Sequence, residues 1–171
     1  MFGKLLGFVV SKKGIEIDQD KVRVIPNLPL PRTQKEVRSF MGRLNYIARF
    51  ISQMTTKCNP IFKMLQKHNF GEWDEECQMA FDKVKEYLTN PPILVPPVQG
   101  KPLILYLTVH EKSMGCVLGQ HHETGHKEQA IYYLSKKFTD YESRYSPLEK
   151  MCCTLAWAAQ RLKQYMLYHT T

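Results

Sequence analysis

The sequence has no hydrophobic run long enough to span a membrane, which takes about 18 or more consecutive apolar residues. The apolar run near its start, Leu5–Val10, is too short for the core of a signal peptide and lacks a small-residue cleavage site. These absences predict an intracellular protein, cytoplasmic or nuclear, that is neither secreted nor bound to a membrane.

Cysteine is scarce and shows neither the pattern of a disulfide framework nor that of a zinc site. The five cysteines form an odd set without a Cys-x-x-Cys spacing: Cys58, Cys77, Cys116, Cys152 and Cys153. The adjacent pair Cys152 and Cys153 cannot bridge easily, because consecutive side chains of a helix point about 100° apart. We therefore expect free thiols in a reducing compartment, most of them packed as small hydrophobic residues.

Paired acids of the kind that hold two catalytic metal ions are also missing, since the sequence contains no Asp-Asp. Glu75 and Glu76 lie in the first turn of an expected helix, where acids usually complement the helix dipole. Three histidines crowd one loop at positions 121, 122 and 126, but a zinc site would need a fourth ligand, for which Cys116 is nearest. An exposed polar loop is the favoured interpretation, and no metal or cofactor is predicted for this chain.

What the sequence does have is a concentrated positive charge. The chain carries a formal net charge of +8, and residues 32–67 hold four arginines, four lysines and one acid, Glu36, a net charge of +7 for that segment. A basic segment of this density indicates a phosphate backbone as partner. The alternative is a solvated helix face that only maintains solubility.

Proline and glycine divide the chain into three parts. In residues 1–18, the apolar runs Leu5–Val10 and Ile15–Ile17 are joined by a short connection that ends at Gly14, which predicts a β-hairpin. A stiff, extended connector is expected next, because its prolines cannot continue a helix. Those prolines are Pro26, Pro29 and Pro31.

Residues 19–95 are expected to hold a small helical unit. Thr33 and Glu36 form a capping box, and the apolar residues after it repeat at the spacing of one helical face as far as Ile51. Two further helices are predicted, one with Asn59 as its N-cap and one with Asp74 as its N-cap.

Residues 96–171 change to the pattern of strands. Short β-prone runs separated by turn residues cover Leu103–Thr108, Gly115–Gln120 and Ala130–Leu134, and they predict a three-stranded antiparallel meander. A helix is expected from Ser146 through Tyr165. Its predicted core face is formed by Leu148, Cys152, Leu155, Ala159 and Leu162. The fold class is therefore α+β.

Motifs along nearly the whole chain occur in an order and at spacings that resemble the reverse transcriptase of gypsy-type LTR retrotransposons. The first half carries Leu6-Gly7-Phe8-Val9-Val10-Ser11, Gly14-Ile15-Glu16-Ile17-Asp18, Lys21-Val22, and the run from Pro31 through Arg38-Ser39-Phe40-Met41-Gly42 to Arg49-Phe50-Ile51. The second half carries Trp73-Asp74, Ala80-Phe81, Pro92-Ile93-Leu94, Gly115-Cys116-Val117-Leu118-Gly119-Gln120, Tyr133-Leu134-Ser135-Lys136-Lys137-Phe138 and Glu149-Lys150. The resemblance implies a palm-end hairpin (1–18), a helical thumb (19–95) and part of an RNase H-like, connection-type domain (96–171).

The resemblance also implies that neither catalytic site of this family is intact here. The palm aspartates are expected upstream of Met1. The first RNase H aspartate corresponds to Thr108 and the first RNase H glutamate to Met151, and the remaining acids are expected beyond Thr171. The family uses Mg²⁺, and a hydroxyl and a thioether do not replace carboxylates for a hard cation.

Within the predicted thumb helix, helical stepping places five residues on one stripe opposite the apolar face. They are Lys35, Arg38, Gly42, Asn45 and Arg49. A glycine inside a helix costs about 1 kcal/mol relative to alanine, and here it would let a nucleic-acid backbone approach closely. Alternatively, Gly42 fits against another helix. In the family, the equivalent helix tracks the primer–template duplex.

Three functions follow. The leading one is non-catalytic, sequence-independent contact with RNA/DNA duplexes as part of a retrotransposon polyprotein, with upstream palm and fingers and downstream RNase H or integrase as partners. The second is an RNA-directed DNA polymerase or RNase H, by ancestry. The third is a decayed transposable-element fragment or a domesticated scaffold without activity.

Overall fold

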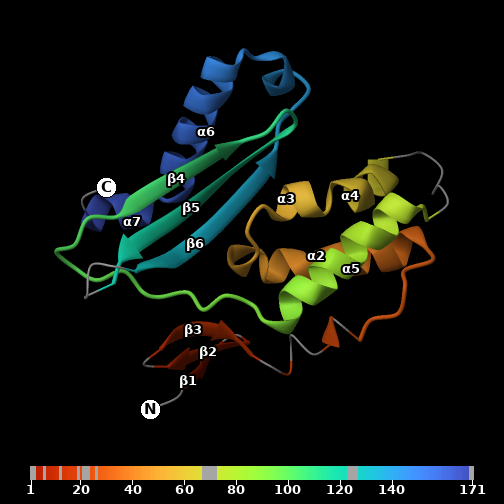
Figure 1. Ribbon diagram of the computed structural model, residues 1–171, viewed down its shortest axis with the longest axis horizontal. Helices are drawn as coiled ribbons and strands as arrows, with labels where there is room; N and C mark the ends of the chain where they lie inside the picture. Colours follow the sequence, from red (N-terminus) through yellow and green to blue (C-terminus); the bar gives the residue numbers. More distant parts are fainter. Residues whose placement is uncertain are drawn as a thin grey trace.

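The computed structural model (Figure 1) describes residues 3–5, 7–11, 13–18, 20, 24–25, 27–66, 73–122 and 127–169. The fold is α+β, as predicted, with two three-stranded antiparallel sheets and a set of helices. The 123–126 loop, including His126, and Pro26 lie outside the described residues. No helix in the described part of the chain is both long enough and apolar enough to cross a membrane.

The N-terminal sheet contains the predicted hairpin together with one additional strand. Its strands are β1 (Gly3–Leu5), β2 (Phe8–Ser11) and β3 (Gly14–Ile17), in the order β1-β2-β3. The prediction of a single strand over the apolar run Leu5–Val10 was wrong, because the chain turns at Gly7, whose φ of +77° lies in the left-handed region. This turn pairs Leu5 with Phe8 across the strands.

The helical unit follows, and Figure 1 shows it beside the second sheet. It comprises α2 (Gln34–Tyr46), the 3₁₀ turn η1 (Ala48–Phe50), α3 (Met54–Lys57), α4 (Asn59–Gln66) and α5 (Glu75–Thr89). The Thr33–Glu36 capping box and the Asp74 cap are both confirmed. The short helix α3 was not predicted.

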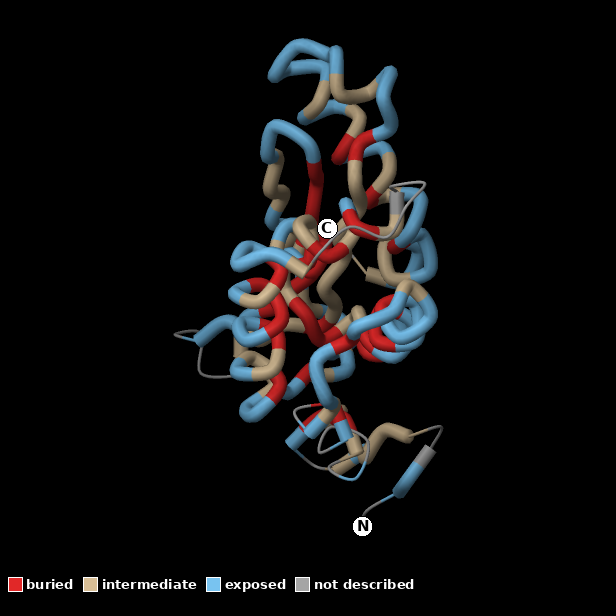
Figure 2. The backbone as a smooth tube through the Cα atoms, turned by 90° about the vertical axis from the view of Figure 1, so that its right-hand side faces the viewer, coloured by how far each residue is buried: buried red, intermediate tan, exposed pale blue. Residues whose placement is uncertain are grey.

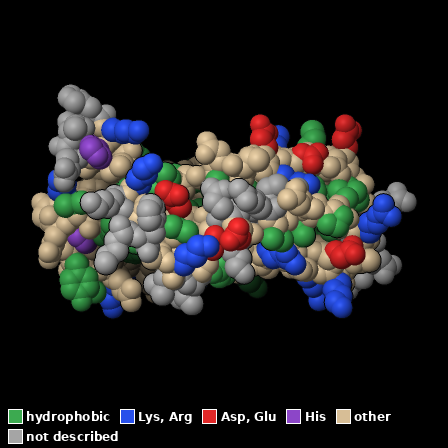
Figure 3. Space-filling model, turned by 90° about the horizontal axis from the view of Figure 1, so that it is seen from below, with side chains coloured by type: hydrophobic (Ala, Val, Ile, Leu, Met, Phe, Trp, Pro, Cys, Tyr) green, Lys and Arg blue, Asp and Glu red, His purple; other side chains and the backbone are tan. Residues whose placement is uncertain are grey.

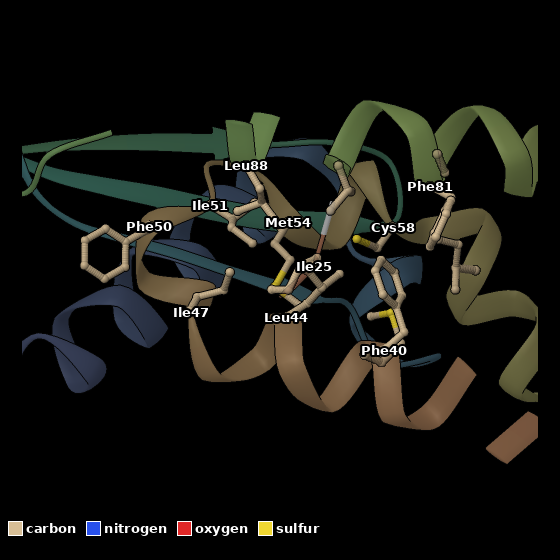
Figure 4. Packing of buried hydrophobic residues seen from close by; sticks show 14 of the residues in the cluster. Ile25, Phe40, Leu44, Ile47, Phe50, Ile51, Met54, Cys58, Phe81 and Leu88 are labelled. Carbon is tan, nitrogen blue, oxygen red and sulfur yellow. The ribbon is translucent and has the colours of Figure 1, made fainter. Parts of the chain in front are cut away.

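One hydrophobic core joins this unit to the N-terminal sheet. Figure 4 shows Phe40, Leu44 and Ile47 of the α2 region directed toward Phe81 and Leu88 of α5. Ile17 of β3 and Leu94 of the linker that follows α5 belong to the same buried cluster, and Phe8 packs against it.

The linker after α5 is tied to both sheets by backbone hydrogen bonds. Ile15 and Leu94 form an antiparallel bridge, with N–H to oxygen distances of 2.6 and 3.0 Å. The next residue, Val95, donates its N–H to the carbonyl of Ala130 at 2.9 Å. The linker therefore lies between the N-terminal sheet and the second sheet.

The second sheet is the predicted meander, with the order β4-β5-β6. Its strands are β4 (Ile104–Val109), β5 (Ser113–His121) and β6 (Glu128–Lys137). The short turn η2 (Glu142–Arg144) leads to α6 (Pro147–Arg161), which starts with the predicted Ser146–Glu149 capping box, and α7 (Lys163–Tyr168) follows. The prediction of one continuous helix to Tyr165 was therefore wrong, because the helix is interrupted at Leu162.

The predicted core face of α6 was also largely wrong. The buried positions are Thr154, Ala158 and Leu162, whereas Leu148 is 73% exposed and Leu155 is 50% exposed. Threonine and alanine let the helix approach the sheet closely, and the Thr154 hydroxyl can be buried because it donates to the Lys150 carbonyl at 2.7 Å. The pale blue turns at the top of Figure 2 show that the end of the molecule where α6 begins is exposed.

Two glycines provide a matched test of the backbone. A Cβ at Gly14, where φ is +132°, would lie 2.4 Å from the carbonyl oxygen of Leu94, whereas a Cβ at Gly42 would meet nothing within 4 Å. We expect Gly14→Ala to lower the free energy of unfolding by about 1–3 kcal/mol. Gly42→Ala should raise it by about 0.5–1 kcal/mol, because alanine is favoured inside a helix. Urea denaturation of both variants measures this, and the two glycines would be equivalent if both changes had the same sign.

Candidate nucleic-acid interface

The outer face of α2 exposes four of the five predicted contact residues. Lys35, Arg38, Gly42 and Asn45 are all exposed, because the opposite side of the helix enters the core. The residues of that buried side are Val37, Phe40, Met41 and Leu44. The helical spacing of the apolar residues thus decides which side of α2 is presented to solvent.

Gly42 lies at an open point of this face. A Cβ added at Gly42 would have no described atom within 4 Å outside its own helix and chain neighbours, so no helix among the described residues packs against the glycine. It lines a shallow depression of about 680 Å³ together with Ser39, Arg43 and Tyr46. The surface of α2 is therefore open at this point.

The fifth predicted residue, Arg49, does not share this face. The prediction required the helix to continue to Ile51, but α2 ends at Tyr46 and Ile47 takes a non-helical conformation. The guanidinium carbon of Arg49 lies 4.9 Å from the centroid of the Tyr132 ring and 5.9 Å from that of Phe8. These cation–π distances place Arg49 where the N-terminal sheet, η1 and β6 meet.

Two further residues of the outer face were not predicted. Arg43 is exposed directly after Gly42 and adds a third cation, and Tyr46 is 49% exposed while its ring stacks on Phe8 with a centroid distance of 5.5 Å. Helical stepping places Tyr46 about 20° from Lys35, next to the predicted stripe, but Arg43 about 80° from Lys35 on the side away from Arg38. The sequence therefore carried a signal for Tyr46 and none for Arg43.

The single acid of the basic segment, Glu36, caps the start of α2. The Glu36 carboxylate accepts hydrogen bonds from the backbone N–H groups of Arg32 and Thr33, at 2.7 and 3.0 Å. These bonds lower the pKa of Glu36 and hold the carboxylate at the start of the helix. Lys57, in contrast, is used internally: its ammonium donates to Ser52 and lies 4.6 Å from the centroid of the Tyr87 ring.

Charges of both signs are present on the face of the molecule shown in Figure 3. On the face seen from below, basic and acidic side chains are interspersed over the helical half (Figure 3). This side of the molecule therefore does not carry charge of one sign.

The two positions that the resemblance assigns to RNase H acids, Thr108 and Met151, lie on elements that pack together. Thr108 is half-buried on β4, opposite Gly115 of β5, and Met151 is 43% exposed on α6, which packs on β4 and β5. Within the described ranges, no three His, Cys, Asp or Glu residues cluster as metal ligands would.

The cysteines are mainly structural. Cys58, Cys77 and Cys116 are buried, as predicted for small hydrophobic side chains, while Cys152 is exposed. Burial raises the pKa of the Cys58 thiol to about 12 and the pKa of the Cys116 thiol to about 11. These two buried thiols therefore stay protonated at neutral pH.

Comparison with known proteins identifies the C-terminal part of the chain. Residues 73–171 match the RNase H-like domain found in reverse transcriptase. The chain belongs to this family. The match begins at Trp73, immediately before α5, and it includes the whole β4–β6 sheet and α6.

Similar proteins extend the likeness to almost the entire chain. The retrovirus-related Pol polyprotein from transposon 412 of Drosophila melanogaster is 33% identical over 161 residues, which are 94% of this chain and 13% of that protein. The foamy viral protease-reverse transcriptase in complex with dsDNA has a TM-score of 0.79 at 24% identity, covering 98% of this chain and 34% of that one. The same viral enzyme in complex with RNA/DNA hybrid has a TM-score of 0.78 at 23% identity, covering 94% and 22%. At these identities the two structures show a shared fold, and this RNase H-like domain occurs in retrotransposon and retroviral polyproteins.

Proposed function

We propose that this chain is a non-catalytic part of a gypsy-type retrotransposon polyprotein that contacts RNA/DNA duplexes without base preference. In this proposal residues 1–18 end the palm, residues 19–95 form the thumb, and residues 96–171 form a degenerate RNase H-like domain. The upstream palm and fingers and the downstream RNase H or integrase are its partners within the polyprotein.

The observation that carries this proposal is the exposed stripe on α2. Lys35, Arg38 and Arg43 are all exposed on α2, and Arg43 lines the depression at the open position Gly42. Three cations of one helix can therefore reach phosphates of a duplex that lies against it. Contacts to phosphates position a protein on nucleic acid without reading its sequence. The viral structures of the same fold, bound to dsDNA and to RNA/DNA hybrid, support the choice of ligand class.

The test is the salt dependence of duplex binding by the full chain. With about three phosphates neutralised, log K should fall against log salt with a slope of roughly −3. Arg38→Ala should reduce the magnitude of that slope by about 1 on duplexes of any sequence. Fluorescence anisotropy with two duplexes of unrelated sequence measures both quantities.

Lys112→Ala is the matched control, because it removes one exposed cation from the loop between β4 and β5. It should leave the slope nearly unchanged. Gly42→Leu should weaken binding without unfolding the chain, since the side chain would project into the depression. If Arg38→Ala left the slope of log K against log salt unchanged, the assignment of α2 to the interface would be contradicted.

The non-catalytic assignment has its own test. We expect the purified chain to show no Mg²⁺- or Mn²⁺-dependent polymerisation and no cleavage of an RNA:DNA hybrid, because Thr108 and Met151 stand where the family has carboxylates. Hybrid cleavage above a metal-free control, abolished by EDTA, would instead favour the enzymatic function. If the chain showed neither duplex binding nor hybrid cleavage, the third function, a decayed fragment or an inactive scaffold, would be favoured.

A further inference from the structure

A cleft of about 690 Å³ lies between the helical unit and the second sheet. Residues near the end of α2 and in η1 form one wall, and residues of β6, α6 and α7 form the other. The two walls are held together by hydrogen bonds between α3 and the sheet: Thr55 to Ser135 at 3.1 Å, and Thr56 to Ser113 at 3.0 Å. The cleft is therefore part of the folded chain, and its volume lies within the range of about 300–1,000 Å³ typical of small-ligand sites.

The lining of this cleft is cationic, and the described residues that form it include no aspartate or glutamate. Arg49 and Arg161 both line it, and neither forms an ion pair with any carboxylate of the described residues. Lys136 also lines it but is bonded to Glu142, with a nitrogen–oxygen distance of 3.1 Å. The two arginines therefore provide a net positive charge that an anion can neutralise.

Aromatic rings accompany these cations. Tyr132 lies under the Arg49 guanidinium at 4.9 Å, and its ring meets that of Tyr165 at a centroid distance of 6.2 Å and an interplanar angle of 64°. Trp157 and Tyr46 line the same space. Aromatic rings beside arginines are the combination on which unpaired nucleobases stack.

Arg49 adds a specific indication of a ligand. Its Nε atom is buried and has no hydrogen-bond acceptor among the described residues. Buried donors are nearly always satisfied, so this nitrogen marks Arg49 as a side chain whose hydrogen-bonding capacity the described residues do not meet. A phosphate oxygen or a base carbonyl oxygen has the required chemistry.

We propose that this cleft binds a short stretch of single-stranded nucleic acid, with unpaired bases against Tyr165 and Trp157 and phosphates beside Arg49 and Arg161. A duplex cannot use these rings, because its bases are stacked on one another and only their edges are accessible. This site adjoins the outer face of α2, with which it shares Asn45 and Tyr46, but it does not include Lys35, Arg38 or Arg43. It rests on the proposed function only in taking nucleic acid as the natural ligand. Asn45 and Gln164, which also line the cleft, can bond the polar edges of any base.

Tryptophan fluorescence tests the proposal directly, because the chain has two tryptophans and Trp157 lines the cleft. Trp73 packs edge-on against Phe81 in the hydrophobic core of the helical unit. A Trp73→Phe variant keeps an aromatic ring at that position and leaves Trp157 as the sole fluorescent tryptophan. Oligothymidylate added to this full-length variant should quench the emission of Trp157 in a saturable way. An abasic oligomer of equal length should bind at least about fivefold more weakly, because stacking is lost.

Two variants locate the binding. Arg161→Gln removes an exposed charge and should weaken oligothymidylate binding, and Tyr165→Leu should weaken it by at least about fivefold. Arg38→Ala should affect a blunt duplex and not the quenching of Trp157 by the single strand. Duplex binding without any quenching by oligothymidylate would overturn the cleft proposal and leave the α2 proposal standing. Quenching unaffected by both cleft variants, or equal affinity for the abasic oligomer, would also overturn it.

Discussion

Replacement of Lys35, Arg38 and Arg43 together by alanine is expected to lower duplex affinity on the order of a thousandfold at about 50 mM salt. In the proposed interface each of these exposed side chains neutralises one phosphate, and neutralising a phosphate releases nearly one condensed counterion. The triple variant no longer releases these counterions, so its residual binding should lose almost all dependence on salt. Anisotropy titrations at several salt concentrations measure both the affinity and the slope.

The matched control removes the same total charge from elsewhere. A triple alanine variant of Lys83, Lys112 and Lys127, all exposed, has the same net charge as the α2 variant. If binding depends on the α2 stripe, this control should retain most of its affinity. Equal losses in the two triple variants would mean that duplexes respond to net charge alone, and α2 would then be only a solubility feature.

The parts of the site that could be predicted from the sequence depend on local periodicity. The capping box at Thr33 starts α2, and the apolar repeat decides which side is buried, so the sequence alone places Lys35, Arg38, Gly42 and Asn45 on one exposed face. The same repeat continues past the end of the helix, since Ile47 and Ile51 are buried too. Periodicity alone could not show that the chain leaves the α-helix at Ile47.

Arg49 shows why this ending matters. Because the backbone tightens into η1, its side chain turns toward β6 and contacts Tyr132, which is more than eighty positions away in the sequence. The aromatic and cationic residues of the cleft are brought together only by the packing of the two halves. In the sequence, Tyr132 and Tyr133 have the properties of ordinary sheet residues.

The error on α6 has a different physical origin. Its sequence offers two candidate faces, and the face with the larger apolar side chains is the one that remains exposed. Close approach to the sheet favours the small residues Thr154 and Ala158, and the Thr154 hydroxyl is satisfied by the helix itself. Hydrophobicity therefore predicted the wrong side, because it ignores the distance between helix and sheet.

Phe81→Ala is expected to lower the free energy of unfolding by about 3–5 kcal/mol. The side chain is 2% exposed, and its ring packs against Phe40 of α2 at 5.0 Å and against Trp73 at 5.7 Å, edge-on. Truncation would remove both ring contacts and leave a cavity where α5 meets α2. A destabilisation of this size is a large fraction of the stability of a domain, which is about 5–15 kcal/mol in total.

Met79→Ala is the control on the same helix, two positions away and 49% exposed, and it should change stability by less than about 0.5 kcal/mol. Urea denaturation followed by Trp73 fluorescence suits both variants, because that tryptophan contacts the substituted ring. The α2 stripe depends on this packing, since the helix that presents Lys35 and Arg38 is held by Phe40. Phe81→Ala should therefore also reduce duplex affinity under conditions that unfold a fraction of the molecules, whereas Met79→Ala should not. A Phe81→Ala protein as stable as Met79→Ala would show that α5 does not anchor the helix that carries the proposed interface.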